Sequence, residues 1–170
     1  MPNGADTASS FANMSTRNPV ILLIDDDPDD RFLVRRAFER LHIENPLIEV
    51  HDGEEAIAYL SGEGQFSDRR KYPFPGILLL DLQMPRIDGL ELLNWIRLNL
   101  TVPNFLIIVL SRVDEIRQVN KAYALGANSF LIKPGSEEEL RGLIASFRDY
   151  WIVGPKALAP KTSKSSARDK

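Results

Sequence analysis

Short apolar runs alternate with stretches of helical periodicity along most of this chain, and this alternation limits its fold more than any other feature. Runs of this length and character are typical of strands buried on both faces of a sheet. We therefore predict five strands. They lie at Val20–Ile24, Leu47–Val50 (the weakest), Gly76–Leu80, Phe105–Leu110 and Ser129–Ile132.

Helical spacing fills the segments between and after these runs. Apolar residues recur at i, i+3, i+4 and i+7 in the first helix (Val34, Ala37, Phe38, Leu41) and in the last (Leu140, Leu143, Ile144, Phe147, Trp151). Ser136 and Glu139 form a capping-box pattern that starts the last helix. The other predicted helices are Glu54–Leu60, Leu90–Leu100 and Val113–Leu125.

Five strands alternating with five helices predict an α/β fold, a doubly wound three-layer sandwich around a parallel sheet. The predicted strand order is 2-1-3-4-5, because right-handed crossovers then cover both faces. A length of 170 residues fits one domain, which we place at residues 19–153. The polar residues 1–18 and 154–170 are expected to be disordered tails. Residues 62–75 form a polar insertion, and loops of this length are often functional or mobile.

Composition argues against several classes of protein. A net charge of -3 does not favour nucleic acid as the main partner, because phosphate binding needs a basic surface. The absence of cysteine excludes disulfides and thiolate metal sites. No apolar run approaches the ~20 residues that span a bilayer, and the N-terminus lacks the apolar core of a secretory signal. We therefore expect a cytoplasmic protein without a membrane partner.

Polar residues gather where the predicted strands end. They are Asp25, Asp26, Asp27, Asp81, Ser111 and Lys133. Ligands bind beyond the carboxyl ends of parallel strands, and the first and third strands are neighbours in the predicted order, so their carboxylates should converge. Converging carboxylates raise one another's pKa values, and a hard divalent cation such as Mg²⁺ relieves that repulsion.

A single Asp at a strand end is usually the N-cap of the next helix, and Asp27, directly before Pro28, fits that role. The full set at one edge is better explained by phosphoryl chemistry. Asp81 can attack phosphorus as a nucleophile and form an acyl phosphate. Mg²⁺ and Lys133 would neutralise the charge, while Ser111 could donate a hydrogen bond to a phosphoryl oxygen.

These residues, in this order, resemble the receiver domain of bacterial two-component response regulators, a CheY-like, flavodoxin-like fold. The resemblance covers about Val20 to Tyr150. Its motifs are Ile21-Leu22-Leu23-Ile24-Asp25-Asp26-Asp27-Pro28, Leu80-Asp81-Leu82-Gln83-Met84-Pro85-Arg86-Ile87-Asp88-Gly89, Val109-Leu110-Ser111 and Ile132-Lys133-Pro134. It implies a phosphoprotein rather than an enzyme, which accepts a phosphoryl group from a sensor histidine kinase and signals to a downstream protein.

The resemblance also implies roles for the site residues. Asp81 is the phospho-acceptor. Asp26, Asp81 and the backbone carbonyl of Gln83 are direct Mg²⁺ ligands, and Asp25 acts through a metal-bound water.

Four further residues stand at or beside positions of known importance in the family. Ser111 and Lys133 contact the phosphoryl group. Phe130 stands at the aromatic switch position, although core packing explains it equally well. Arg112 departs from the small residue that often follows the hydroxyl position, and such a long cation could slow access to the site or bind the phosphate.

Softer signals resemble the free-standing receivers that serve bacterial phytochrome kinases. They are the acidic pattern at residues 25–30, the Gly-Glu-Gly-Gln-Phe insertion at 62–66 and the aromatic ending at 149–151. The consecutive residues Tyr150, Trp151, Ile152 and Val153 cannot all be buried by one helix face, so we also expect a homodimer through this segment.

Three other functions compete with a phosphorylated receiver. A phosphohydrolase of the haloacid dehalogenase type would need a second Asp at the position of Gln83. A nucleotide-binding module would need a glycine-rich loop after the first strand, where three Asp stand instead. A pseudo-receiver used as a scaffold would lose the acidic pair or the lysine, and both are present.

Overall fold

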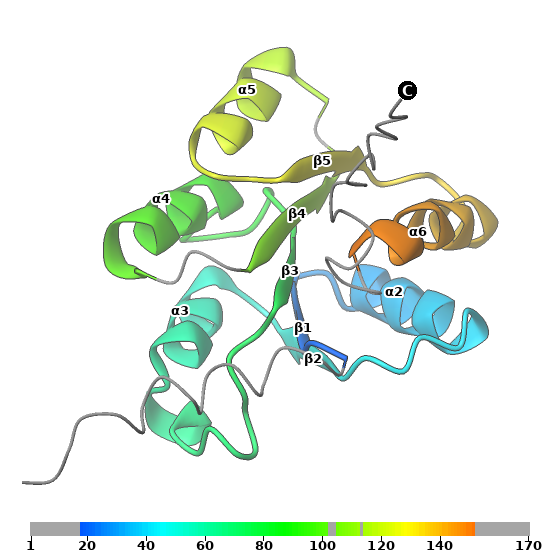
Figure 1. Ribbon diagram of the computed structural model, residues 1–170. Coiled ribbons are helices and arrows are strands. Elements are labelled where there is room, and N and C mark those ends of the chain that lie inside the picture. The colour runs from blue at the N-terminus through cyan, green and yellow to red at the C-terminus, as the bar shows by residue number, and fades with distance from the viewer. Residues whose placement is uncertain (1–17, 102–104, 113, 152–170) are drawn as a thin grey trace, which may run out of the picture.

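A five-stranded parallel sheet forms the middle layer of the molecule (Figure 1). The computed structural model describes residues 18–101, 105–112 and 114–151. For Tyr150 and Trp151 it describes the backbone but not the side chains. Its strands are β1 (Ile21–Ile24), β2 (Leu47–Val50), β3 (Ile77–Leu80), β4 (Leu106–Ser111) and β5 (Ser129–Ile132). The observed order, β2-β1-β3-β4-β5, confirms the predicted one.

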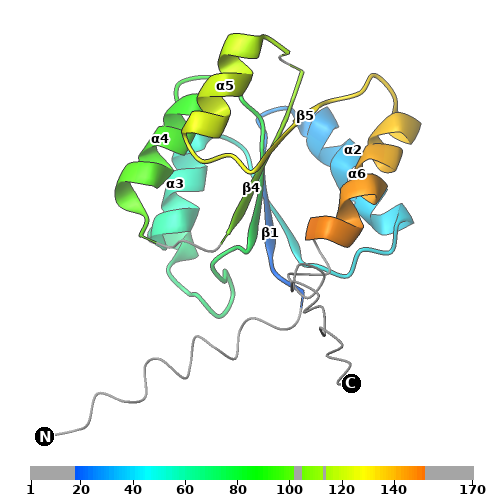
Figure 2. The same ribbon diagram turned by 45° about the horizontal axis from the view of Figure 1, so that its top comes forward.

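Helices cover both faces of the sheet (Figure 2). On one face lie α2 (Pro28–Arg40) and α6 (Glu137–Trp151). On the other lie α3 (Gly53–Ser61), α4 (Gly89–Asn99) and α5 (Ile116–Ala124). The predicted start of α5 at Val113 is wrong by three residues, because the backbone of Glu115 is still extended.

The apolar runs are explained by two cores, one on each side of the sheet. Alternate residues of a strand point to opposite faces. In β1, Ile21 and Leu23 pack with α2 and α6, whereas Leu22 and Ile24 pack with α3, α4 and α5. Every residue of β1 and β3 is buried, so neither strand has a polar face to interrupt its apolar run.

Side chains at the sheet edge cap the helices that leave it. The Asp27 carboxylate accepts the Asp29 N–H at the start of α2, which confirms the predicted cap. Asp88 and Glu91 form a reciprocal capping box at the start of α4. The Ser136 hydroxyl accepts the Glu139 N–H at 3.2 Å, as the sequence pattern predicts for the last helix.

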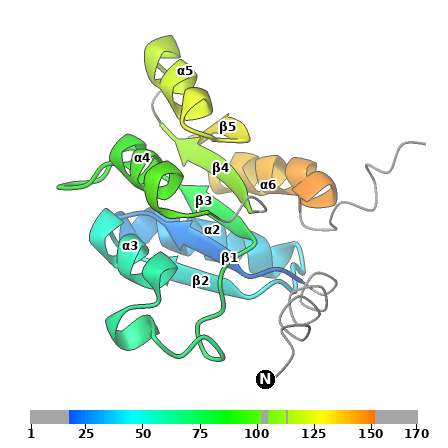
Figure 3. The same ribbon diagram turned by 60° about the vertical axis from the view of Figure 1, so that its left-hand side comes forward.

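The insertion between α3 and β3 packs against the end of α3 (Figure 3). It contains a short 3₁₀ helix, η1 (Gly64–Phe66), whose Phe66 is buried beside Tyr59 and Tyr72. The Arg69 guanidinium donates to the carbonyls of Tyr59 and Leu60, both at 2.8 Å. Composition favours a mobile or functional loop here, but these contacts make the insertion a packed extension of the core.

The two predicted tails, residues 1–18 and 154–170, lie outside the described residues except for Asn18. Among the described helices, none is both long enough and apolar enough to cross a membrane.

Candidate phosphoryl and metal site

Three carboxylates meet at the carboxyl edge of the sheet. Oxygens of Asp25, Asp26 and Asp81 lie within 4.8 Å of one another. Asp25 and Asp26 follow β1, and Asp81 follows β3, which pairs with β1 in a register that sets Ile24 opposite Leu80. The Asp81 N–H donates to the Ile24 carbonyl at 3.0 Å. Pairing of the two central strands therefore produces the predicted cluster.

The loop after Asp81 is held close to the site. The Gln83 N–H donates to Asp81 Oδ1 at 3.3 Å, and the Gly89 N–H donates to the Leu82 carbonyl at 2.9 Å. A Cβ at Gly89 would lie 2.5 Å from the Asp81 carbonyl oxygen, so only glycine permits this turn of the chain. This close return fixes the backbone of the segment that includes Gln83.

Lys133, directly after β5, contacts these carboxylates. Its Nζ lies 2.6 Å from Asp25 Oδ2, 2.9 Å from Asp30 Oδ2 and 3.4 Å from Asp81 Oδ2. Burial alone would lower the pKa of Lys133, but the hydrogen bond and charge of Asp25 outweigh it and raise the pKa. The lysine is therefore a fixed positive charge beside the acceptor carboxylate.

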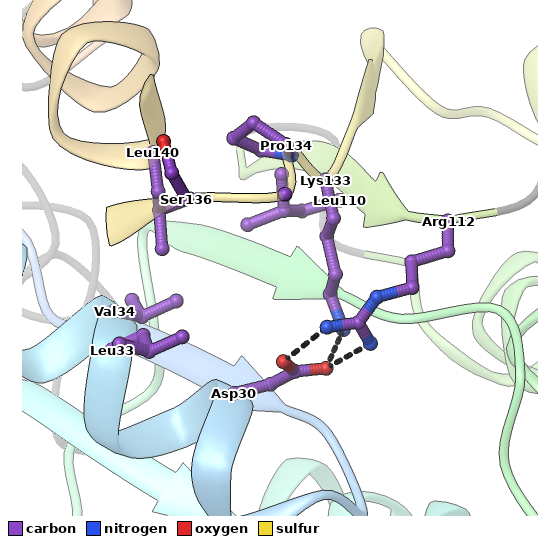
Figure 4. Close-up of a pocket in the computed structure, with 10 residues that line it drawn as sticks. Asp30, Leu33, Val34, Leu110, Arg112, Lys133, Pro134, Ser136 and Leu140 are labelled. Carbon is purple, nitrogen blue, oxygen red and sulfur yellow. Dashed lines mark hydrogen bonds and ion pairs between the residues drawn. The ribbon is translucent and has the colours of Figure 1, made fainter. Parts of the chain in front are cut away.

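Asp30, in the first turn of α2, is part of the site, a role that was not predicted from the sequence. Arg112 binds it through two hydrogen bonds, at 2.6 Å and 2.7 Å (Figure 4). Burial would raise the pKa of Asp30, but hydrogen bonds from Arg112 and Lys133 lower it below its ordinary value. The one available signal was the Asp-Asp-Asp-Pro-x-Asp pattern, whose last residue looks like an ordinary acid in the first turn of a helix.

The electrostatics of this group suit a divalent cation. Desolvation by burial raises the pKa of Asp25, whose side chain is almost completely buried. Four carboxylates (Asp25, Asp26, Asp30, Asp81) face two cations (Lys133, Arg112), which leaves a formal charge of −2. Oxygen ligands from carboxylates and carbonyls are those that hard cations such as Mg²⁺ prefer. The residues present therefore fit the metal that the sequence predicts.

Ser111 and Phe130 lie on the two strands beyond the acceptor. Ser111 ends β4, is fully buried, and its carbonyl accepts the Lys133 N–H at 2.9 Å. Phe130, in β5, is half-buried against the core shared with α3, α4 and α5, and its N–H donates to the Tyr123 hydroxyl at 3.1 Å. The structure thus brings Asp25, Asp26, Asp81 and Lys133 into one cluster, with Ser111 at the end of the neighbouring strand β4 and Phe130 half-buried against the core.

Comparison with known proteins agrees with this geometry. A family model described as "Response regulator receiver domain" matches residues 21–145. The chain is 30% identical to the response regulator Rcp1 of Synechocystis over 78% of this chain and 88% of Rcp1. It is 32% identical to the probable methanogenesis regulatory protein FilR2 of Methanothrix harundinacea, over 83% and 88% of the two chains.

Solved structures give the same picture. Response regulator RPA3017, in red light signalling of R. palustris, is 34% identical, with a TM-score of 0.73 over 78% of this chain and 93% of that one. The Mn²⁺-bound form of Rcp1 is 30% identical, with a TM-score of 0.70 over 79% and 94% of the two chains.

Proposed function

Because the chain belongs to the response regulator receiver domain family, we propose that it accepts a phosphoryl group on Asp81 from a sensor histidine kinase. This is a signalling family, not a family of enzymes. The observation that carries the proposal is the position of Asp81. Its carboxylate belongs to the three-carboxylate cluster and also lies 3.4 Å from Lys133 Nζ.

The transfer requires little more than positioning and charge neutralisation. A carboxylate oxygen of Asp81 attacks phosphorus in the phosphohistidine of the kinase. The phosphorus–nitrogen bond breaks, the imidazole keeps its electron pair and later takes up a proton, and Asp81 becomes an acyl phosphate. Lys133 balances the added negative charge, and the Ser111 hydroxyl donates a hydrogen bond to a phosphoryl oxygen.

Mg²⁺ is the metal that we assign to this site. Asp26 and Asp81 would bind it directly together with the Gln83 carbonyl, and Asp25 would act through a metal-bound water. When bound, the ion neutralises charge that develops on the phosphoryl oxygens. The charge of −2 left by the carboxylates and cations supports this assignment, as does the Mn²⁺ in the Rcp1 structure.

The signal leaves the domain by a change of conformation and contact with another protein. Ser111 would move towards the phosphoryl group, and Phe130 would fill the space that it leaves, in a shift between two pre-existing states. The half-buried position of Phe130 beside exposed Tyr123 and Ile132 supports a change that reaches the surface.

Partners follow from the relatives. We assign the protein to the cytoplasm. We also assign a phytochrome-type histidine kinase as the phosphoryl donor, because similar structures include the cyanobacterial phytochrome response regulator RcpA and RPA3017, a response regulator in red light signalling. We retain a homodimer through Tyr150–Val153 as part of the proposal. The side chains of that segment lie outside the described residues.

Acetyl phosphate with Mg²⁺, followed by intact mass spectrometry, tests the proposal. Wild type should gain the mass of one phosphoryl group, and Asp81→Asn should gain none, because the change removes the nucleophile and little else. Asp68→Asn, in the exposed part of the insertion, is the matched control and should behave like wild type. A phosphoryl gain in Asp81→Asn at the wild-type rate would move the acceptor elsewhere.

The same experiment separates the rival functions. A scaffold-type pseudo-receiver would gain no phosphoryl group in any variant. A phosphohydrolase of the haloacid dehalogenase type would release phosphate through repeated turnover, which the family assignment and Gln83 in place of its second Asp both argue against.

A further inference from the structure

We propose that Asp30 is a positioning residue that holds Lys133 in the unphosphorylated protein, and that Arg112 is the cation that lets Asp30 release Lys133 to a phosphoryl group. This inference rests on the proposed phosphorylation of Asp81. It assigns Asp30 and Arg112 to control of the lysine rather than to contact with the phosphoryl group.

The contacts of Asp30 are the first step of the argument. The residue is 5% exposed, and both of its oxygens are used. Oδ1 accepts from Arg112 at 2.7 Å, while Oδ2 accepts from Arg112 at 2.6 Å and from Lys133 at 2.9 Å. Figure 4 shows the two cations meeting the Asp30 carboxylate from the ends of two different strands. Asp30 is therefore a buried anion shared between two cations.

The distances from Lys133 give the second step. In this state its Nζ is closer to Asp25 and Asp30 than to Asp81, at 2.6 Å and 2.9 Å against 3.4 Å. A phosphoryl group on Asp81 adds charge and strong acceptor oxygens, so it draws the ammonium towards Asp81. That movement weakens the contacts of Lys133 with Asp25 and Asp30, and we assign the larger loss to Asp30, which has an arginine as a second partner.

The cost of that release depends on Arg112. A buried carboxylate that loses its cation without replacement is strongly unfavourable. Arg112 binds both oxygens of Asp30 in the bidentate geometry that suits a guanidinium, so Asp30 stays paired when Lys133 turns away. The Arg112 side chain is itself 55% exposed, so it can hold Asp30 without being desolvated like Lys133, which is 6% exposed.

A small cavity beside this group leaves room for the change. It measures about 50 Å³ and lies between α2 and the start of α6 (Figure 4). Leu33, Val34, Leu110 and Leu140 form its apolar wall, and Pro134, directly after Lys133, also lines it. The backbone that carries Lys133 therefore borders free space rather than a filled core.

A double-mutant cycle with a phosphoryl mimic tests the inference. Beryllofluoride with Mg²⁺ is titrated into wild type, Arg112→Ala, Asp30→Asn and the double variant, with binding followed by ¹⁹F NMR. Arg112→Ala should weaken binding about tenfold, because Lys133 must then leave Asp30 without a cation. In the Asp30→Asn background the same change should cost about twofold or less, because no carboxylate remains to compensate.

The alternatives give different outcomes. If Arg112 bound the phosphoryl group directly, its removal would cost as much in the Asp30→Asn background as in wild type, and the inference would be overturned. Full affinity in Arg112→Ala would overturn it too. A pair with a structural role alone would change the thermal midpoint of the ligand-free protein without coupling in the affinities, which also overturns it.

Controls keep these outcomes apart. Arg36→Ala removes an arginine of α2 that pairs with Glu137 at 2.8 Å, and it should leave the affinity for beryllofluoride unchanged. Arg112→Gln repeats the test if Arg112→Ala is poorly folded, and Arg112→Lys should restore part of the affinity by returning the charge. Wild type that binds no beryllofluoride would overturn the receiver function and this inference together, whereas wild-type binding without coupling overturns the inference alone.

Discussion

Arg69 and Arg112 each fix a segment of this molecule, but they bind partners of different kinds. Arg69 donates to three backbone carbonyls, those of Tyr59, Leu60 and Tyr72, and its guanidinium lies 5.9 Å from the Tyr59 ring centroid. Arg112 binds one carboxylate that also binds Lys133. Backbone carbonyls carry no formal charge and need no balancing cation, whereas a carboxylate shared by two cations can exchange one for the other.

The difference separates stability from switching. In the insertion, Arg69 donates to two carbonyls in the last turn of α3, and it lies against Gly62, whose φ of 67° ends the helix. At the sheet edge, the guanidinium of Arg112 shares the Asp30 carboxylate with Lys133, and a phosphoryl group on Asp81 can change how the two cations divide it. We therefore expect substitutions in the insertion to change the unfolding free energy, and those at the edge to change ligand binding.

The largest expected effect is that of Arg69→Ala. It removes three hydrogen bonds from a charged donor and uncovers the aromatic cluster, so the unfolding free energy should fall by about 2–3 kcal/mol. Beryllofluoride affinity should stay at the wild-type value. Urea denaturation measures the first quantity, and Arg70→Ala is the matched control, because that neighbouring side chain is 96% exposed. Equal stability of the Arg69 and Arg70 variants would show that the insertion does not stabilise the fold.

The fold itself could be predicted from the sequence, because β1 and β3 are buried on both faces and are therefore continuously apolar. Apolar runs such as that of β1 and helical spacing such as that of α2 are local patterns, and their alternation along the chain, with right-handed crossovers, predicts the sheet order. The site was predictable for the same reason. Asp25 and Asp81 directly follow the buried strands β1 and β3, Asp26 comes one residue later, and Lys133 directly follows β5.

Asp30 and the role of Arg69 could not be found in this way. Asp30 and Arg112 are 82 positions apart, and an acid in the first turn of a helix is common for local reasons. Arg69 lies in a polar segment whose composition resembles a loop, and its partners are backbone carbonyls, which leave no trace in the sequence. Both residues acquire their roles from tertiary contacts, so only the structure reveals them.

A smaller effect should appear at high pH in the insertion. Burial raises the pKa of Tyr59 from 10.0 to about 12, and its hydroxyl donates to the Pro73 carbonyl at 2.7 Å. The folded state therefore holds this proton more tightly than the unfolded state. The stabilisation is complete below pH 10 and is lost as pH rises through about 12, by about 2 kcal/mol in total.

Comparison with Tyr59→Phe isolates this contribution, because the variant cannot ionise there. Unfolding free energies measured between pH 9 and 12 should converge as the pH rises. Tyr72→Phe, a change of the same kind in the same aromatic cluster, serves as the control and should keep the decline of wild type. Parallel curves for wild type and Tyr59→Phe would place the Tyr59 hydroxyl in contact with water.

The smallest expected change in stability is that of Arg112→Ala. In the ligand-free protein Lys133 still holds Asp30 at 2.9 Å, so the carboxylate keeps a cation when the arginine is removed. The Arg112 side chain is 55% exposed, and ion pairs at this exposure contribute about 1 kcal/mol or less. Urea denaturation should therefore give nearly the same unfolding free energy for Arg112→Ala as for Arg36→Ala.

The comparison between the two arginines then becomes quantitative. Arg69→Ala should lower the unfolding free energy and leave beryllofluoride binding unchanged, whereas Arg112→Ala should leave the unfolding free energy nearly unchanged and weaken beryllofluoride binding. A loss of stability in Arg112→Ala as large as that in Arg69→Ala would mean that Lys133 does not compensate Asp30 alone, and the distinction between a structural and an exchangeable arginine would fail.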